Sequence, residues 1–172
     1  MIQITTPRLI IRNWQPSDLA HWHRMFSNTL NMHFVEHMQC HTIEESRARL
    51  QTAIDAIQDN PRVKYFFAVE LAQTGQFIGS IGFMTEMKVG ELWGNFGWFL
   101  LPEYQGHGYM TQAFRALIPH AFGHWGVAVI DAGCNVANKA SERIMQQNGM
   151  KLVRQHNDRL DYQLKKEDWL NS

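Results

Sequence analysis

The segment Gln105-Gly106-His107-Gly108-Tyr109-Met110 joins an apolar, aromatic stretch to a run with helical spacing. Its two glycines free the backbone for unusual dihedral angles and for close approach of a ligand. The helix that follows presents unpaired N–H groups and the positive end of its dipole, which together favour an anion, most often a phosphate. The segment therefore predicts a phosphate-binding loop, with a tight strand-to-helix turn that binds nothing as the alternative.

Two familiar phosphate loops fit this segment poorly. A P-loop requires a Lys-Ser or Lys-Thr pair after its last glycine, and this segment has neither. A Rossmann fingerprint requires a third glycine where this chain has Thr111, although Asp131 stands about twenty residues on, where a ribose-binding acid is expected. Three predicted strands with short connections precede the loop, and such connections favour antiparallel neighbours. A doubly wound nucleotide-binding fold is therefore disfavoured.

Periodicity and turn signals place the elements that position this loop. Strands are predicted at residues 8–14, 64–71, 76–85, 91–100 and 127–136, with a closing hairpin at 150–166. Helices are predicted to begin at Pro16-Ser17-Asp18, at Thr42 with a capping box to Glu45, after Gly108 and at Asn138. The order β-α-α-β-β-β-α-β-α-β-β indicates a mixed α/β sheet, in a single domain covering residues 1–172.

Four segments in this order resemble the GNAT superfamily of acetyltransferases, in its Rim-type (ribosomal-protein N-acetyltransferase) branch. They are TPRLIIR (6–12), FIGSIGF (77–83), GWFLLPEYQGHGYMTQAF (97–114) and NVANKASERIMQQNGMKLV (135–153). The resemblance covers nearly the whole chain. It implies the GNAT fold, a central mixed, mostly antiparallel sheet of about seven strands flanked by four helices. Two positions depart from the family pattern: Met110 replaces a small residue, and Met150 replaces a common aromatic.

The resemblance implies an acetyl-CoA-dependent N-acetyltransferase that moves an acetyl group directly to a primary amine in a ternary complex. The acceptor is either a protein N-terminal amine or a small-molecule amine. The implied cofactor-binding residues are Trp98, Phe99 and Leu100 for the pantetheine arm, Gln105, Gly106, His107, Gly108, Tyr109 and Met110 for the pyrophosphate, and Asn138 and Ser141 beside the pantetheine and the thiol.

The catalytic residues that the resemblance implies come from two segments. Ser141 is the expected donor to the leaving thiolate, because the position of the tyrosine that many relatives use is Met145 here. Relatives often carry a glutamate base where this chain has Asn95, whose amide can orient a water but cannot accept a proton. Glu91, four residues earlier and on the same face of a regular strand, is the candidate base, with water alone as the alternative. The missing tyrosine and glutamate also leave open a non-catalytic acyl-CoA-binding module.

Composition and charge narrow the classes of function. Lys plus Arg equals Asp plus Glu, 16 each, so no single-sign field favours nucleic acid or an anionic membrane as a partner. No run approaches the roughly 18 apolar residues of a membrane span, and the N-terminal segment lacks the apolar core of a signal peptide. We interpret Cys40 and Cys134 as reduced thiols in a cytoplasmic protein.

The histidines raise the question of a metal. His33, His37 and His41 recur every four residues, and on one helix that spacing would place three ligands on one face. We interpret them instead as part of a variable loop on the substrate side, and predict no metal. The sequence is compatible with a monomer or a homodimer.

Overall fold

The computed structural model describes residues 2–171, and the chain falls into two compact units. The first unit comprises residues 1–82 and 98–109, and the second comprises residues 83–97 and 110–172. Two long strands, β4 (Phe77–Lys88) and β5 (Glu91–Leu100), contribute to both units. The glycine loop therefore belongs to the first unit, whereas the segment with Asn138 and Ser141 belongs to the second.

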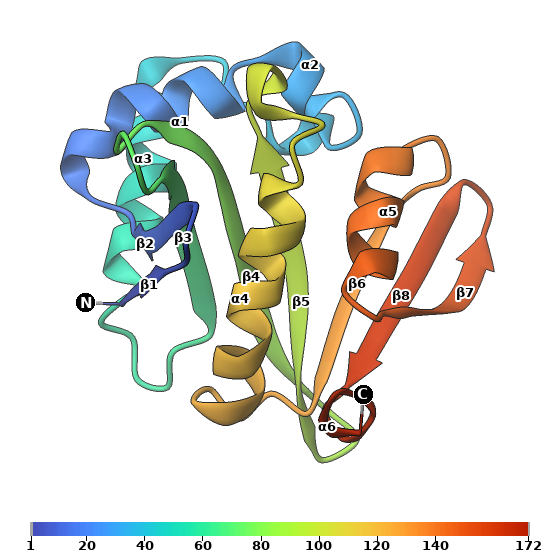
Figure 1. Cartoon of the computed structure of the whole chain (residues 1–172). Coiled ribbons are helices and arrows are strands. Elements are labelled where there is room, and N and C mark those ends of the chain that lie inside the picture. The colour runs from blue at the N-terminus through green and yellow to red at the C-terminus, as the bar shows by residue number, and fades with distance from the viewer. Residues whose placement is uncertain (1, 172) are drawn as a thin grey trace. The chain divides into compact units, whose positions relative to one another are not determined.

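Within residues 2–171, eight strands are hydrogen-bonded in the order β1-β2-β3-β4-β5-β6-β8-β7 (Figure 1). The other strands are β1 (Gln3–Thr5), β2 (Leu9–Asn13), β3 (Lys64–Leu71), β6 (Val129–Asn135), β7 (Lys151–His156) and β8 (Arg159–Lys165). β5 and β6 are parallel, whereas the pairs β1–β2, β2–β3, β6–β8 and β7–β8 are antiparallel. The sheet is thus mixed and mostly antiparallel.

The same residues contain six α-helices and three short 3₁₀ helices. The α-helices are α1 (Leu19–Phe26), α2 (Thr29–Met32), α3 (Ile43–Asp55), α4 (Tyr109–Gly123), α5 (Lys139–Gln147) and α6 (Lys166–Leu170). The 3₁₀ helices are η1 (Pro16–Asp18), η2 (Glu36–Met38) and η3 (Pro102–Tyr104). No helix among these residues is long and apolar enough to cross a membrane.

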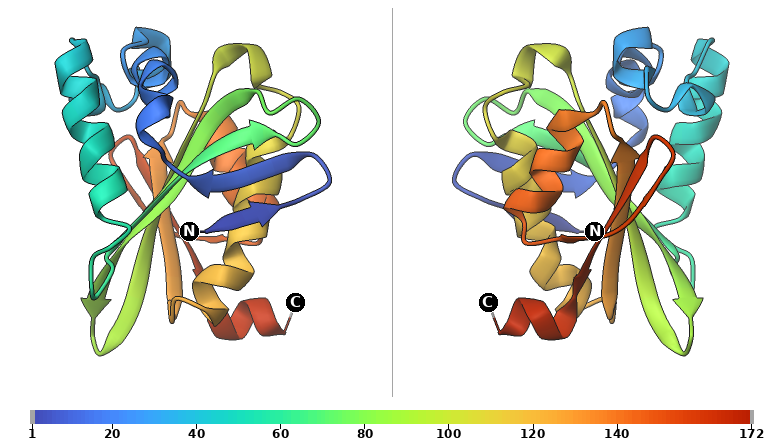
Figure 2. Two further views of the ribbon diagram at one scale, coloured as in Figure 1. Left: turned by 90° about the vertical axis from the view of Figure 1, so that its left-hand side faces the viewer. Right: turned by 90° about the vertical axis from the view of Figure 1, so that its right-hand side faces the viewer.

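The core of the first unit is aromatic and gathers around α1. Trp22, Met25 and Phe26 share one side of this helix and are buried. The Trp22 ring lies edge-on to Trp14, with 4.9 Å between the ring centroids. α1 and α3 pack side by side over this core (Figure 2). The strand ends that lead to the glycine loop are anchored here, because Leu101, one residue past β5, belongs to the same cluster.

The core of the second unit decides which face of its strands remains open. Phe83 and Phe96 stack with ring centroids 4.4 Å apart, and Phe96 lies 5.1 Å from Phe114 of α4. Side chains alternate along a strand, so burial of Phe96 under α4 turns Trp93 and Asn95 to the opposite face of β5. That opposite face carries the pocket of this unit.

The mixed α/β class and the GNAT-type topology are confirmed, but the element counts differ from those expected. Eight strands and six α-helices replace about seven and four. β1, α2 and α6 have only three, four and five residues, which is too short for a periodic signal in the sequence. α2 instead depends on a local cap, because the Asn28 side chain accepts hydrogen bonds from Leu30 N and Asn31 N.

Two alternatives from the sequence can be compared with this fold. The strands β1 to β3 that precede the glycine loop are antiparallel, which excludes the doubly wound Rossmann arrangement. His33, His37 and His41 do not share a helix, because α2 ends at Met32 and η2 covers only Glu36–Met38. Among residues 2–171, no group of three or more His, Cys, Asp or Glu residues is placed to hold a metal ion.

Candidate functional site

The glycine loop of the first unit depends on two left-handed backbone positions. β5 ends at Leu100, η3 follows, and α4 begins at Tyr109 directly after the loop. Gly106 has a φ of 80° and Gly108 a φ of 73°, conformations that residues with a Cβ rarely adopt. A Cβ at either position would meet nothing within 4 Å, so the backbone conformation and not crowding explains the glycines. Tight turns of this kind bring backbone N–H groups to the surface at a helix start.

Arg8, which directly precedes β2 in the first unit, contacts this loop. Its Nη2 donates a hydrogen bond to the His107 carbonyl oxygen at 2.9 Å, across 99 positions of sequence. Its guanidinium carbon also lies 4.3 Å from the centroid of the Tyr109 ring. The loop thereby gains a fixed cation beside its glycines. Arg8 lies in the TPRLIIR segment, where no local sequence pattern marks it as a site residue.

The donors in this region suit an anion. Within residues 2–171, the backbone N–H groups of Gly106, His107 and Gly108 form no hydrogen bond with another group. α4 has 15 residues, so its helix dipole places roughly half a positive charge at its N-terminus. Met110 is 2 % exposed, so its side chain lies in the core and does not cover the glycines of the loop. A diphosphate fits this set of donors and the charge of Arg8.

The strand residues expected to bind pantetheine, Trp98 to Leu100, end β5 and are half-buried. The Leu100 carbonyl oxygen accepts a hydrogen bond of 3.3 Å from Gln105 Nε2, which ties the strand end to the start of the loop. Phe99 packs on the aromatic core of the first unit. The hydrogen bond therefore places the Gln105 side chain next to the end of β5.

Asn138 and Ser141 lie together at the start of α5 in the second unit. Asn138 Oδ1 accepts a hydrogen bond from Ser141 N at 3.1 Å, so Asn138 is the N-cap of this helix. The Ser141 side chain is half-buried, and its hydroxyl forms no hydrogen bond with any group of residues 2–171. Back-bonding of the hydroxyl to its own helix, the structural alternative for this serine, is therefore not observed. Met145 is fully buried.

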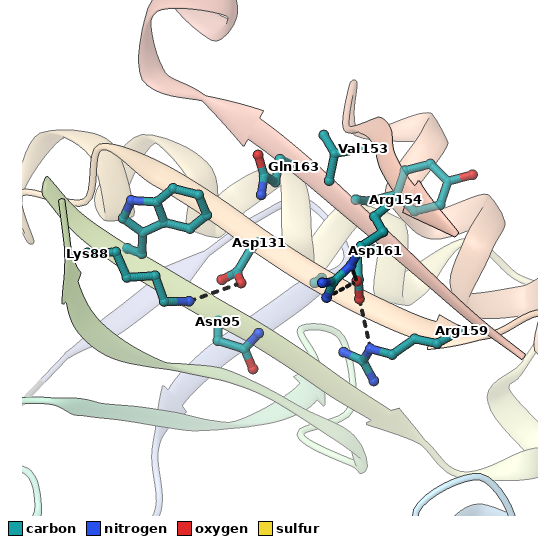
Figure 3. Close-up of a pocket in the computed structure, with 11 residues that line it drawn as sticks. Lys88, Asn95, Asp131, Val153, Arg154, Arg159, Asp161 and Gln163 are labelled. Carbon is teal, nitrogen blue, oxygen red and sulfur yellow. Dashed lines mark hydrogen bonds and ion pairs between the residues drawn. The ribbon is translucent and has the colours of Figure 1, made fainter. Parts of the chain in front are cut away.

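A cavity of about 480 Å³ opens on the strand face of the second unit opposite to α4 (Figure 3). We call it the Asp131 pocket. Its lining comes from β4, β5, β6, β7 and β8: Lys88, Trp93, Asn95, Asp131, Ala132, Val153, Arg154, Arg159, Asp161, Tyr162 and Gln163. Asn95 is thus a pocket residue, whereas Glu91 is exposed at the first position of β5 and does not line the pocket.

Asp131 is the carboxylate at the end of this pocket that Lys88 and Asn95 line, and we call this end the Lys88 end. It pairs with Asn95 in the parallel register of β5 and β6. Its Oδ2 lies 3.7 Å from Lys88 Nζ, while its Oδ1 is buried and has no hydrogen-bond partner among residues 2–171. Burial raises the pKa of Asp131 above its usual value, and the nearby Lys88 and Asn95 oppose this shift without cancelling it. The sequence pattern marks Asp131 only as a possible ribose-binding acid of a Rossmann fold.

Two arginines, Arg154 and Arg159, hold a second carboxylate at the other end of the pocket, which we call the Arg159 end. Asp161 accepts hydrogen bonds from Arg154 Nε at 2.8 Å and from Arg159 Nε at 2.7 Å. Desolvation of Asp161 raises its pKa, but the two arginines prevail and hold it below its usual value. Gly133 makes room for this cluster, because a Cβ there would lie 2.4 Å from Arg159 Nη2.

Known proteins share both the sequence pattern and the fold. A family model described as "Acetyltransferase (GNAT) domain" matches residues 8–151 of the chain. The chain belongs to the GNAT acetyltransferase family. This GNAT chain is also 27% identical over 150 residues to the "Uncharacterized N-acetyltransferase YnaD" of Bacillus subtilis (strain 168), which covers 87% of this chain and 83% of YnaD.

Solved structures with the same fold belong to proteins whose names state different amine substrates. Ribosomal-protein-S5-alanine acetyltransferase from Vibrio fischeri has a TM-score of 0.79 and 18% identity, over 98% of this GNAT chain and 99% of the other. Spermidine N-acetyltransferase from Vibrio cholerae, solved with CoA and spermine, has a TM-score of 0.81 and 19% identity, over 96% and 100%. At these identities the likeness establishes the fold.

Proposed function

We propose that this protein is an acetyl-CoA-dependent N-acetyltransferase that transfers an acetyl group to a primary amine. The transfer is direct, within a ternary complex, and the acceptor is a protein N-terminal amine or a small-molecule amine. The observation that carries the proposal is the glycine loop, with two left-handed glycines, free backbone donors and Arg8 beside it. Membership of the GNAT family supplies the acyl-CoA that such a loop would hold.

Binding of acetyl-CoA is assigned mainly to backbone groups. The loop from Gln105 to Met110 would hold the pyrophosphate, with the charge of Arg8 beside it. The backbone of Trp98–Leu100 would hold the pantetheine arm, and one N–H of this strand would polarise the acetyl carbonyl as negative charge develops on its oxygen. Asn138 would contact the pantetheine amide in addition to capping α5.

The transfer step requires a neutral amine and a stabilised thiolate. Ser141 is proposed as the donor to the thiolate, which its half-buried and unbonded hydroxyl supports. Asn95 would orient a water or the acceptor at the pocket, where it lies beside Asp131. Glu91 stays a proposed base only as an exposed residue that reaches the acceptor through water, because it does not line the pocket.

The branch of the family is also proposed. The Asn138-to-Ser141 motif at the start of α5 supports a Rim-type enzyme, for which an amine next to a peptide bond, in a protein N-terminus or a small peptide, is the expected acceptor. A panel of peptides with N-terminal alanine or serine, set against spermidine, tests this assignment. Turnover of the polyamine in preference to every peptide would contradict it.

The second candidate function is a module that binds acyl-CoA without transferring the acyl group. The observation that favours it is that Met145 is fully buried where many relatives place a tyrosine, with an amide at Asn95. This candidate predicts CoA binding with no turnover of any amine.

Thermal unfolding with acetyl-CoA, CoA and NAD, measured side by side, tests the binding proposal first. A ligand at a hundredfold over its dissociation constant stabilises the folded state by about 2.7 kcal/mol. We expect stabilisation by both CoA species and none by NAD. Release of free thiol from acetyl-CoA in the presence of an amine panel then distinguishes the enzyme from the binding module. A chain that neither CoA species stabilises would overturn both candidates.

A further inference from the structure

The Asp131 pocket combines groups of opposite charge at its two ends. Figure 3 shows Lys88, Asn95 and Asp131 at one end and Arg154, Arg159 and Asp161 at the other. The pocket lining holds three cations and two carboxylates, so it carries an excess of one positive charge when both carboxylates are ionised. A cavity of about 480 Å³ is within the range of small-ligand sites.

Two buried polar atoms at the Lys88 end lack hydrogen-bond partners among residues 2–171. Asp131 Oδ1 can accept a hydrogen bond and Trp93 Nε1 can donate one, and neither does so within residues 2–171. A buried polar atom without a partner destabilises the folded state, and a ligand that hydrogen-bonds to it removes that cost. A protonated amine provides donors for Asp131, and the aromatic ring of Trp93 provides an apolar wall for the group that carries the amine.

The Arg159 end has unused hydrogen-bond donors for an anion. Arg159 reaches Asp161 through Nε, and neither of its terminal nitrogens forms a hydrogen bond within residues 2–171. The two terminal nitrogens of a guanidinium form a fork that matches a carboxylate. Arg159 extends over Gly133, which the missing side chain at that position permits.

Strand geometry sets the spacing between the two ends. In the β6–β8 register Asp131 faces Gln163, and Gly133 faces Asp161. Asp131 and Gly133 are two residues apart on β6, which corresponds to about 6.6 Å along the strand. Two residues of an extended peptide span about 7 Å. An amine at Asp131 and a carboxylate at Arg159 are thus separated by roughly the length of a dipeptide.

We propose that the Asp131 pocket binds the acceptor as a small zwitterion of dipeptide size, with its amine at Asp131 and its carboxylate at Arg159, and that Asp131 accepts the amine proton. The role of Asp131 as proton acceptor rests on the proposed acetyltransferase function, whereas the binding of the zwitterion does not. It disfavours polyamines, because a second or third positive charge would approach Arg154 and Arg159.

The proton balance of the proposed step is closed. The acceptor ammonium gives one proton to the Asp131 carboxylate and becomes a neutral amine. The amine nitrogen then forms a bond with the acetyl carbon as the carbon–sulfur bond breaks, and its second proton passes to the Ser141 hydroxyl as that hydroxyl gives its own proton to the leaving thiolate. The products are an N-acetyl amide, CoA thiol and protonated Asp131, which returns its proton to water. Burial raises the pKa of Asp131, which makes it a stronger base for this transfer than an exposed aspartate.

The experiment compares three amines on the full chain, with binding and turnover as separate readouts. Glycylglycine carries both charges, glycylglycinamide lacks the carboxylate, and 1,4-diaminobutane has a second amine in its place. Calorimetry with CoA present measures affinity, and thiol release from acetyl-CoA measures kcat/KM. We expect glycylglycine to exceed both others by about tenfold or more in each readout, which is the effect of one good ionic contact.

Variants of the two pocket ends sharpen the test. Arg159→Gln should abolish the preference for glycylglycine over its amide, because the ligand carboxylate loses its guanidinium partner. Asp131→Asn should lower kcat by about 10²-fold or more for both, with thermal stabilisation by CoA retained. Lys151→Gln, which removes an ion pair with Asp168 outside the pocket, is the matched control and should change neither.

Each outcome decides one of the two proposals. Equal use of the three amines, a preference for the diamine, or full activity of Asp131→Asn would overturn the inference while the proposed function stands. If CoA binds but no amine is acetylated, the proposed function fails. Glycylglycine binding that both pocket variants weaken would then still support the zwitterion pocket, and absence of binding would overturn it.

Discussion

The glycine loop of the first unit and the Asp131 pocket of the second unit present different parts of the chain to a ligand. In the loop, Gly106 and Gly108 shape the backbone, and the free groups are main-chain N–H groups. In the pocket, a regular backbone holds side chains of Asp131, Arg159 and Trp93 over the strand face. A site made of backbone tolerates many side chains but few changes of conformation. A site made of side chains has the opposite sensitivity.

This contrast assigns different tasks to the two regions. Backbone donors and Arg8 suit a part of the ligand that every acetyl donor shares, namely the diphosphate of CoA. Side chains of fixed charge suit the part that differs between substrates, namely the acceptor. We therefore expect loop variants to change cofactor affinity and second-unit variants to change turnover.

The largest effect outside the pocket is expected for Ser141→Ala. Loss of the hydroxyl at the start of α5 should lower kcat by about 10²-fold, because the leaving thiolate loses its proton donor. Thermal stabilisation by CoA should not change. Ser141→Cys, which keeps a proton on a side chain of similar size, should retain part of the rate. A fully active alanine variant would remove Ser141 from the mechanism and leave water as the donor.

Gly108→Val tests whether the loop acts through its backbone. A β-branched residue at a φ of 73° is strained by about 1–3 kcal/mol, so the loop should leave this conformation and CoA affinity should fall by about 10-fold or more. Titration of CoA by calorimetry measures the change. The matched control is Gly75→Val in the turn before β4, where φ is 70°. This control should lose similar stability and keep its CoA affinity. Equal CoA affinities in the two variants would contradict the role of the loop.

Arg8→Gln should weaken CoA binding by a smaller factor, about 3- to 10-fold, because the loop loses its cation and the hydrogen bond to the His107 carbonyl. Arg8→Lys keeps the charge but loses the contact with the Tyr109 ring. Its CoA affinity should therefore lie between those of the wild type and Arg8→Gln. The difference should shrink as salt is added, because the arginine is exposed and its charge is screened. A factor that does not depend on salt would point to a purely structural role for Arg8.

The smallest expected effect is that of Asp131→Asn on stability. Unlike the variants above, which lose rate or affinity, this variant should gain stability. The folded-state pKa of Asp131 is raised above the ordinary 3.8, so the unfolded chain releases this proton first as pH rises. Folded-state stability is therefore lost between pH 3.8 and the folded pKa, and the loss persists at neutral pH. Asp131→Asn removes the loss, so its melting temperature at pH 7 should exceed that of the wild type. The two melting temperatures should converge below pH 3.8.

The charges that face Asp131 limit the size of this gain. Lys88 stabilises the carboxylate and loses a partner in the variant, while the Asp161 cluster with its two arginines stays intact. A lower melting temperature for Asp131→Asn at pH 7 would mean that the pair with Lys88 outweighs burial.

Much of the fold and the loop could be predicted because their signals are local. Strands β3 and β5 were placed with their observed bounds, since turns bracket short apolar runs. The Thr42 cap of α3 is confirmed by the hydrogen bond from Glu45 N, although the Glu45 carboxylate reaches His41 N and not Thr42 N. The left-handed conformation of Gly106 and Gly108 could be predicted, because two closely spaced glycines between a strand and a helix are typical of positive φ angles.

The sequence by itself thus determined the fold class, the order of elements and the loop, because short-range sterics and periodicity encode them. Tertiary structure alone decided the rest. Arg8 reaches His107 across 99 positions, and no local pattern pairs them. Asp131 meets Asn95 only through the parallel register of β5 and β6, and burial under neighbouring strands then sets its pKa. Asn95 and Asp131 line a pocket because their face of the strands is left open. The opposite face is covered by the packing of Phe83, Phe96 and Phe114.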